Sequence, residues 1–572
     1  MTSAGPFPQP LAADLAIVGG GSVAVSLLYQ FLLALQGDGA RLADRPLRVV
    51  LFEPQAELGP GGAYQEDLPS NLLNIPAGNM SARADQRMDF VDWLRGQDPA
   101  WLRAYGVDAV APSDFLPRPL FGAYLRAVHA RCRELASSLG VTLTHVQSRA
   151  QSVTPVDDGA ARVDDVRLDD RRVGAGAGPV RVAPEHGAPW LARHVVLCNG
   201  NLPSQAFPHL EDAPGYFNSP YPVSALTGAI ARDASVCVVG TSLSAVDAIA
   251  ALQQSGHRGP ILCVSRNGRL PAVRSPHNQP PAALRHLSRE GALQLAARHG
   301  GTLSVAVIAQ ALKDEVRAAG GALDTDDVLG LEADAQTALD EEIRRSSQAA
   351  RPWQAVAAAT NAAVDQIWHL MPDAERSRFQ SQWRSLWMAR RATFPMRNAL
   401  KLQALFQSGQ LQVRAGYVDS RHDPADQLFH TRLRGAAGIA THSSRYLINA
   451  TSFSVDAGAT RDPLVAALLR DGHARPDPFG GLALDFATGC LRNAQDALLP
   501  RISVLGSLAG GTYFWTTSMD VNARLARDQA QRLAAALTCQ PPLIGPESPA
   551  DSPSPARWPA RTPTHPAPTA SS

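Results

Sequence analysis

The chain has 572 residues, of which 45% are hydrophobic and 18% charged, and its formal net charge is +1. This length allows two or more domains with full hydrophobic cores. The balanced charge gives no sign of nucleic-acid or membrane binding, so we expect small-molecule chemistry. The composition does not indicate an oligomeric state. Six cysteines without a CxxC pair or metal-ligand spacing disfavour a flavin disulfide reductase and a metal site, and indicate a reducing, cytoplasmic location.

Residues 11–35 are apolar enough to be mistaken for a signal peptide or a membrane span. However, Asp14 and three consecutive glycines interrupt them, and no basic segment precedes them. We therefore predict a buried parallel strand, a tight turn and a buried helix.

The turn in LAIVGGGSVA, residues 15–24, has the spacing of a dinucleotide-binding motif. Gly19 permits the tight turn, Gly21 allows a pyrophosphate close to the backbone, and Ala24 lets the helix pack near the strand. The next predicted strand, LRVVLFEP, ends in Glu53 after a long connection, GDGARLADRP. A carboxylate at this point accepts hydrogen bonds from ribose hydroxyls, so the first site is predicted to bind FAD.

A second copy of the pattern, VCVVGTSLSA, occupies residues 236–245 and contains Gly240, Ser242 and Ala245. Serine and alanine replace glycine at the last two positions, and their side chains leave less room for a nucleotide close to the backbone. The following strand leads to Arg266 and Arg269 instead of an acid. Cations at this point suit a 2′-phosphate, so we predict an NAD(P)H site that favours NADPH, although either arginine could simply face solvent.

The chain order predicts an α/β fold with two Rossmann-like domains, the second inserted in the first. The FAD-binding domain spans 1–215 and 440–540, the NAD(P)H-binding domain 216–439, and a Pro-rich, disordered tail 541–572. Residues 156–190 are expected to form a β-meander. Residues 280–390 are rich in Ala and Gln with helical periodicity, which predicts a helical cap able to close a substrate cavity.

Several segments together resemble one family of FAD- and NAD(P)-binding proteins. They include LLNIPAGNMSARADQRMDFVDWL (72–94), PRPLFGAYL (117–125), GHRGPILCVSRNGRLP (256–271) and VLGSLAGGTYFWTTSMDVNARLA (504–526), besides the two glycine turns. The family includes a bacterial FAD-dependent urate hydroxylase and the aspartate N-monooxygenases that form nitrosuccinate. The chain departs from a common flavoprotein pattern at Cys198-Asn199-Gly200, where Ala-Thr-Gly is usual.

The resemblance implies a role for particular residues toward FAD. Gly19, Gly21, Ser22 and Glu53 would hold its ADP half, and Asn74, Ala77 and Met80 would approach the flavin. Gly506, Gly510 and Thr512 would close over the ring system, and a helix starting near Val521 would direct its N-terminus at the flavin carbonyl edge. Trp515 is either a cavity wall or a core aromatic.

We expect a FAD-dependent, NAD(P)H-oxidising monooxygenase that uses molecular oxygen to hydroxylate a small, anionic molecule, since the flavin carries the difficult chemistry. The resemblance favours urate, giving 5-hydroxyisourate in purine catabolism, and leaves N-hydroxylation of an amino acid such as aspartate as the alternative. A flavin-linked NAD(P)H reductase or a non-catalytic nucleotide sensor would use the same two sites. Arg390, Arg391 and Arg397 are the candidates for binding a substrate anion, although a solvated basic helix is the favoured interpretation of that segment.

Overall fold

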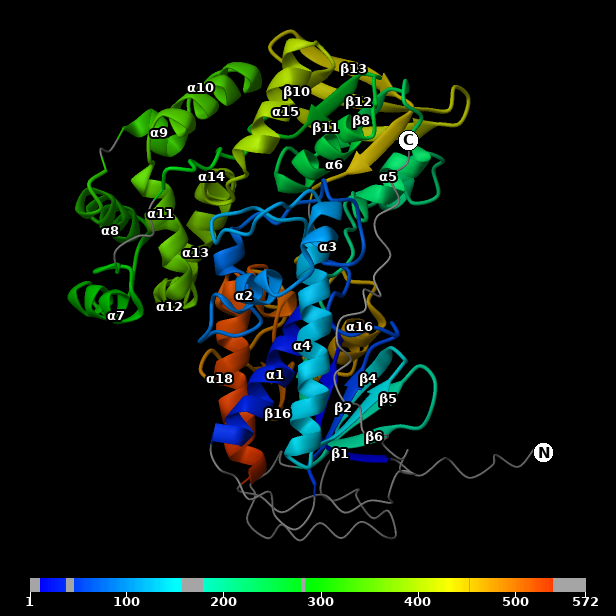
Figure 1. Ribbon diagram of the computed structural model, residues 1–572, viewed down its shortest axis with the longest axis vertical. Coiled ribbons are helices and arrows are strands. Elements are labelled where there is room, and N and C mark those ends of the chain that lie inside the picture. Colours follow the sequence, from blue (N-terminus) through cyan, green and yellow to red (C-terminus); the bar gives the residue numbers. More distant parts are fainter. Residues whose placement is uncertain are drawn as a thin grey trace.

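A computed structural model describes residues 11–37, 46–156, 178–278, 283–321, 324–451 and 453–538. The connection predicted at GDGARLADRP, the middle of the predicted β-meander, Cys539 and the predicted tail at 541–572 fall largely or wholly outside these residues. In Figure 1 the molecule has two sheet-containing units, one above the other, with a group of helices at the side of the upper unit.

The lower unit contains an eight-stranded sheet with the order β15-β16-β6-β1-β2-β3 along its main path. The pairs from β16 to β3 are parallel, β15 is antiparallel to β16, and a β4–β5 hairpin pairs antiparallel with β6. Its strands are β1 (Leu11–Val18), β2 (Arg48–Phe52), β3 (Thr142–Val146), β4 (Ala150–Pro155), β5 (Val180–Pro184), β6 (Trp190–Leu197), β15 (Cys490–Arg492) and β16 (Leu498–Val504).

The prediction of a strand and a helix over residues 11–35 is confirmed. β1 is central and almost fully buried, as expected for an apolar run in a parallel sheet, and α1 (Ser22–Gly37) follows directly. α1 packs between α4 (Arg118–Ser138) and α18 (Met519–Thr538), visible side by side in Figure 1. The shorter helices of this unit are η1 (Ala77–Asn79), α2 (Asp89–Arg95), α3 (Pro99–Ala104), α16 (Pro463–Arg470), η5 (Ser507–Ala509) and α17 (Gly510–Tyr513).

The upper unit contains a five-stranded, all-parallel sheet with the order β10-β9-β8-β14-β7. A small antiparallel sheet, β11-β12-β13, accompanies it. The strands are β7 (Tyr216–Phe217), β8 (Val236–Val239), β9 (Ile261–Val264), β10 (Leu411–Arg414), β11 (Tyr417–Asp423), β12 (Leu428–Gly435), β13 (Gly438–Ser444) and β14 (Tyr446–Asn449). The helices are η2 (Pro208–Leu210), α5 (Val223–Ala229), α6 (Leu243–Gln254) and α15 (Met396–Gln407).

The described residues between β9 and α15 form helices and no named strand, as the composition predicted. We refer to this group, α7 to α14, as the cap. Its elements are α7 (Arg289–Arg298), α8 (Val305–Ala318), α9 (Thr325–Leu329), α10 (Ala335–Gln348), α11 (Pro352–Ala359), η3 (Thr360–Ala362), α12 (Val364–Leu370), α13 (Asp373–Arg378), the π-helical turn η4 (Phe379–Trp383) and α14 (Arg384–Arg391).

The predicted fold class is therefore confirmed. After the upper sheet is complete at β14, the chain returns to the lower unit, where β16 pairs with β6 and α18 covers α1. Each unit has its own apolar core. The exact domain boundaries stay predictions.

Candidate functional site

The first glycine turn lies at the carboxyl edge of the lower sheet, between β1 and α1. Gly19 adopts φ +105°, and a Cβ there would lie 2.4 Å from the carbonyl oxygen of Cys198. No other residue fits this position, because both the conformation and the space exclude a side chain. Ser22 begins α1, and Ala24 is fully buried in the lower core. The free N–H groups at the start of α1 are suited to a phosphate.

Glu53 lies beside this turn, directly after β2. Its carboxylate accepts hydrogen bonds from the backbone N–H of Gly20, at 2.8 Å, and of Gln55, at 3.1 Å. An ionised carboxylate offers about four acceptor positions, so capacity remains for ribose hydroxyls. The residues present therefore fit the adenosine end of FAD.

A second glycine-rich loop, residues 58–62, packs against the first and was missed by the sequence analysis. The N–H of Gly59 donates to the carbonyl of Gly20 at 2.7 Å, and a Cβ on Gly61 would lie 3.1 Å from the Cα of Gly21. The glycines of LGPGG just after Glu53 were a signal for this close contact.

The NIPAGNM segment is held by backbone hydrogen bonds to the loop before α4. Ala77 and Gly78 donate to the carbonyls of Asp114 and Pro112, at 2.9 and 2.8 Å. Ala77 and Met80 are buried in the lower core, whereas Asn74 is exposed. The three residues thus do not face one common surface.

The segment after β16 returns to the first glycine turn, far away in sequence. Gly506 follows the end of β16, and a Cβ there would lie 3.7 Å from Val23 of α1. Gly510 and Thr512 lie in α17, and Thr512 is buried. α18 begins at Met519, with Asp520 in its first turn. The parallel strands thus bring Gly506, Gly19 and Glu53 to one edge.

A basic cavity of about 170 Å³ lies between the NIPAGNM region, η3 and α18. Asn79, rather than Asn74, borders it. Four arginines in its wall were missed by the sequence analysis: Arg83, Arg87, Arg524 and Arg527. Three of them pair with carboxylates, of Asp85, Asp365 and Asp528, so most of this positive charge is neutralised within the protein.

The second glycine turn is built like the first. Gly240 adopts φ +118°, and a Cβ there would lie 2.3 Å from the carbonyl oxygen of Ala450. Ser242 precedes α6 and its side chain makes no capping hydrogen bond, while Ala245 is fully buried against the upper sheet. Serine and alanine are therefore compatible with the turn, and the helix start remains available to a phosphate.

Arg266 and Arg269 are exposed in the loop after β9. Ser265 holds this loop, since its hydroxyl accepts from the N–H of Gly268 at 2.9 Å. Partial desolvation, together with repulsion from Arg266, lowers the pKa of Arg384, a residue on the surface at the start of α14. Among the described residues none of these three arginines makes an ion pair. Arg266 and Arg384 are close enough to repel each other, and such a pair of guanidinium groups fits a phosphate. Arg384 was missed because it follows 118 residues after Arg266 and only folding brings it near.

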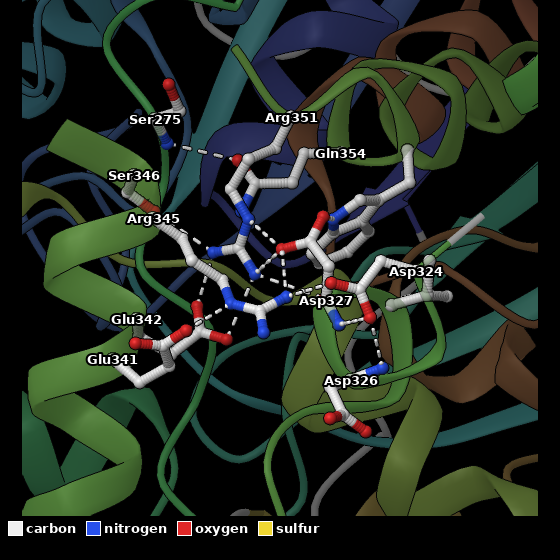
Figure 2. Close-up of polar contacts among 12 residues, drawn as sticks. Ser275, Asp324, Asp326, Asp327, Glu341, Glu342, Arg345, Ser346, Arg351 and Gln354 are labelled. Carbon is white, nitrogen blue, oxygen red and sulfur yellow. Dashed lines mark hydrogen bonds and ion pairs between the residues drawn. The ribbon is translucent and has the colours of Figure 1, made fainter. Parts of the chain in front are cut away.

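The expectation of a solvated basic helix at residues 388–397 is wrong for Arg390. Its guanidinium is buried and contacts Glu342 at 2.8 Å, and it donates to the carbonyls of Asp327 and Val328 at 2.6 and 3.0 Å. Arg351 contacts the same Glu342 carboxylate at 2.5 Å, and Figure 2 shows Arg351 between Glu342 and Asp327. The charge of Arg390 is therefore compensated by residues of α9 and α10 within the cap.

Arg391 faces in another direction and is also buried. It donates to the side-chain carbonyl of Asn361 at 2.5 Å, and its guanidinium lies 5.4 Å from the centre of the Trp515 ring. Trp515 is half-buried. No carboxylate among the described residues lies within ion-pair distance of Arg391. Burial lowers its pKa, and the more distant Asp520 offsets this only in part.

Arg397 is exposed on α15 and does not join these arginines. The five cysteines among the described residues are all buried and free. Asp423, Asp426 and His430 lie close enough together on the β11–β12 hairpin to bind a cation, but His430 already bonds to Asp426 and Ser443. Within the described ranges, no helix is both long and apolar enough to span a membrane.

Comparisons with known proteins agree with this geometry. Residues 16–202 match the FAD-NAD(P)-binding family, so the chain contains a FAD/NAD(P)-binding domain. The uncharacterized protein YdhS of Escherichia coli (strain K12) is 25% identical over 252 residues, which cover 42% of this chain. The match spans only 39% of that relative's length.

Two solved structures share the fold over most of the chain. The reduced form of ornithine hydroxylase from Pseudomonas aeruginosa has a TM-score of 0.55 at 14% identity, covering 92% of this chain and all of that one. L-lysine 6-monooxygenase from Pseudomonas syringae has a TM-score of 0.52 at 16% identity, covering 92% and 99%. At such low identity the likeness establishes the two-unit dinucleotide-binding fold.

Proposed function

We propose that this chain is a FAD-dependent monooxygenase that oxidises NADPH and hydroxylates a small organic anion with molecular oxygen. The observation that carries the proposal is the pair of glycine turns with opposite charge beside them. A carboxylate, Glu53, lies at the first turn, and three arginines without ion-pair partners among the described residues lie near the second. The ornithine and lysine enzymes that share the fold support the same reaction class.

In this proposal the first turn holds the ADP half of FAD. The backbone of Gly19 and Gly21 lets the pyrophosphate approach, Ser22 and the start of α1 donate N–H groups to it, and Glu53 accepts from the ribose. Ala24 lets α1 pack close to the sheet. When bound, FAD supplies electron transfer from NADPH and the activation of oxygen.

The second turn would bind NADPH in the same way. Gly240 and the start of α6, after Ser242, receive the pyrophosphate, and Ala245 allows close helix packing. Arg266 and Arg269, joined by Arg384, would bind the 2′-phosphate, because guanidinium groups pair well with phosphate oxygens.

The flavin end would lie where three segments meet. In the NIPAGNM segment, the buried Ala77 and Met80 would shape this region, and the exposed Asn74 would lie at its edge. The segment after β16 would close it with Gly506, Gly510 and Thr512. The N-terminus of α18 offers its partial positive charge to a carbonyl edge. The cap excludes water from the reacting groups.

Arg391 is the substrate-anion residue in this proposal, because it is buried without a carboxylate partner. Arg390 is excluded by its pairing with Glu342, and Arg397 by its exposed position on another helix. Urate and aspartate, which the resemblance suggests, serve as two polar anions in a screen of candidate substrates.

The test is to purify the full chain, record its absorption spectrum and add NADPH. We expect a yellow protein whose flavin absorbance is bleached by NADPH and restored by oxygen. A substrate converts NADPH oxidation from hydrogen peroxide release to product formation, which separates a monooxygenase from a reductase. A colourless protein, after FAD has been added and removed by gel filtration, would disprove the proposal.

A further inference from the structure

The cap lines an apolar cavity of about 270 Å³ that is partly open to solvent. Side chains from α8, α11, α12, η4 and α14 line it. Aromatic rings dominate the wall: Trp353, Trp368, Phe379, Trp383, Trp387 and Phe514. Such a wall binds an apolar or aromatic body, and it offers few partners to a polar one.

The cavity shares one wall residue, Phe514, with the segment proposed to close the flavin site. Phe514 follows α17, in the segment that continues from Gly506. The ring of Trp368 stacks on Phe514 with centroids 4.8 Å apart, and its N–H donates to the carbonyl of Gly511 at 2.7 Å. A molecule in this cavity therefore contacts the same segment that closes the proposed flavin site.

Few charged or polar side chains reach this wall. Arg390 is paired with Glu342, Thr360 donates to the carbonyl of Ala357 at 2.6 Å, and Lys313 is exposed to solvent. Arg391 differs from them, since it is 7% exposed and, within the described ranges, bonds only to the neutral amide of Asn361.

A half-buried arginine, Arg274, adds to the positive charge near Arg391. Burial, and then repulsion from Arg391, lowers the pKa of Arg274 to about 10. Arg274 donates to the hydroxyl of Thr393 at 3.1 Å and, like Arg391, has no carboxylate within ion-pair distance among the described residues. A buried and a half-buried like charge without a counter-ion repel each other, so a bound anion would stabilise this arrangement.

We propose that the substrate is a small molecule with an aromatic or aliphatic body and one carboxylate, the body filling the cap cavity and the carboxylate pairing with Arg391. This inference rests on the proposed monooxygenase function and gives its substrate class. It disfavours urate and polar amino acids, because their remaining polar groups would lose hydrogen bonds with water and find few partners in the cavity. Guanidinium and carboxylate pair in a planar, two-bond geometry.

The test is calorimetric binding to the full-length, FAD-loaded protein. The probes are 4-phenylbutanoate, its neutral isostere 4-phenylbutanamide, and L-ornithine as a polar comparison. We expect the acid to bind about 10- to 100-fold more tightly than the amide, the gain of one charge-assisted pair, and ornithine to bind more weakly than either.

Arg391→Met should abolish the preference for the acid and leave binding of the amide unchanged, and Arg391→Lys should restore part of it. Arg298 is an exposed arginine on α7 of the same cap. As the matched control, Arg298→Met should change the affinity for neither the acid nor the amide. Ala357→Phe, which fills the cavity from α11, should weaken acid and amide alike, and unfolding midpoints show whether each variant folds.

Equal binding of acid and amide, or tighter binding of ornithine, would overturn the inference. A different result would refute the proposed function. If the protein bound 4-phenylbutanoate through Arg391 but retained no FAD, the cavity would bind an acid without any flavin-dependent activity. A yellow protein that is bleached by NADPH but does not bind 4-phenylbutanoate would support the proposed function and refute the substrate class.

Discussion

A buried ion pair joins the two units, and breaking it should weaken the whole molecule. Arg118, at the start of α4 in the lower unit, contacts Asp247 of α6 in the upper unit at 3.1 Å. Tyr221 donates to the same carboxylate at 2.6 Å, and Arg118 also donates to the carbonyl of Leu72 at 3.0 Å. The Asp247 side chain is 7% exposed and that of Arg118 15%. Asp247→Asn would leave Arg118 as a buried cation without a counter-ion.

The structure sets the size of this effect. Removing one partner of a buried, hydrogen-bonded pair costs about 3–5 kcal/mol, because the desolvation cost of the other charge remains. Burial acts to lower the pKa of Arg118, while Tyr221 and Asp247 raise it overall in the unaltered protein. A guanidinium remains protonated in proteins even without such a partner, so Arg118 stays charged in the variant. We expect Asp247→Asn to lower the free energy of unfolding, measured with urea and tryptophan fluorescence, by about that amount.

The exposed pair Arg258–Asp233, with side chains 72% and 73% exposed, is the matched control. Asp233→Asn should cost less than about 1 kcal/mol, since solvent screens this pair. The double variant Arg118→Met/Asp247→Leu should lose less stability than the two single charge removals added together. If Asp247→Asn were no more destabilising than Asp233→Asn, the pair would not hold the units together.

Three further predictions concern the nucleotide sites and the lower sheet. Arg266→Ala should raise the KM for NADPH about tenfold and leave the KM for NADH nearly unchanged; equal changes in both would remove Arg266 from 2′-phosphate binding. Glu53→Gln should weaken FAD binding about tenfold, measured by flavin retention during dialysis, because one charged acceptor at the ribose is lost; full retention would refute the assignment. Burial, with Arg501 and Arg193, lowers the pKa of His194 to about 3 in the folded protein. Below the ordinary histidine pKa of about 6.5, the His194 imidazole therefore binds a proton in the unfolded chain but not in the folded one. The contribution of His194 to the free energy of unfolding is complete above about pH 6.5 and is lost progressively toward pH 3. His194→Gln should therefore flatten this part of a plot of urea midpoint against pH. An unchanged slope would contradict the lowered pKa of His194.

The glycine turns show how much of the fold was predictable from local sequence. A β-branched run, a glycine and an apolar helical pattern occur within about ten residues in each copy, so the signal does not depend on distant parts of the chain. The acid at the end of β2 and the arginines after β9 follow from the same pattern. These features predicted the parallel strands at the centre of both sheets and the charged residues beside each glycine turn.

The arginines of α14 show what local sequence could not decide. Arg390 and Arg391 are adjacent and chemically identical, and the segment was expected to be a solvated basic helix. Their burial depends on α9, α10 and α11, which supply Asp327, Glu342 and Trp353 around Arg390. Adjacent residues on a helix point about 100° apart, so Arg391 reaches Asn361 and Trp515 instead.

By itself the sequence determined the strand–turn–helix units, the helical composition of the cap and the residue types beside each nucleotide site, because neighbouring residues carry these signals. Only the tertiary structure decided which arginine pairs with a carboxylate and which contacts a neutral amide instead. It also decided that the cap cavity is apolar and that Arg384 joins Arg266. Burial and pairing depend on residues separated by tens or hundreds of positions, which no local pattern specifies.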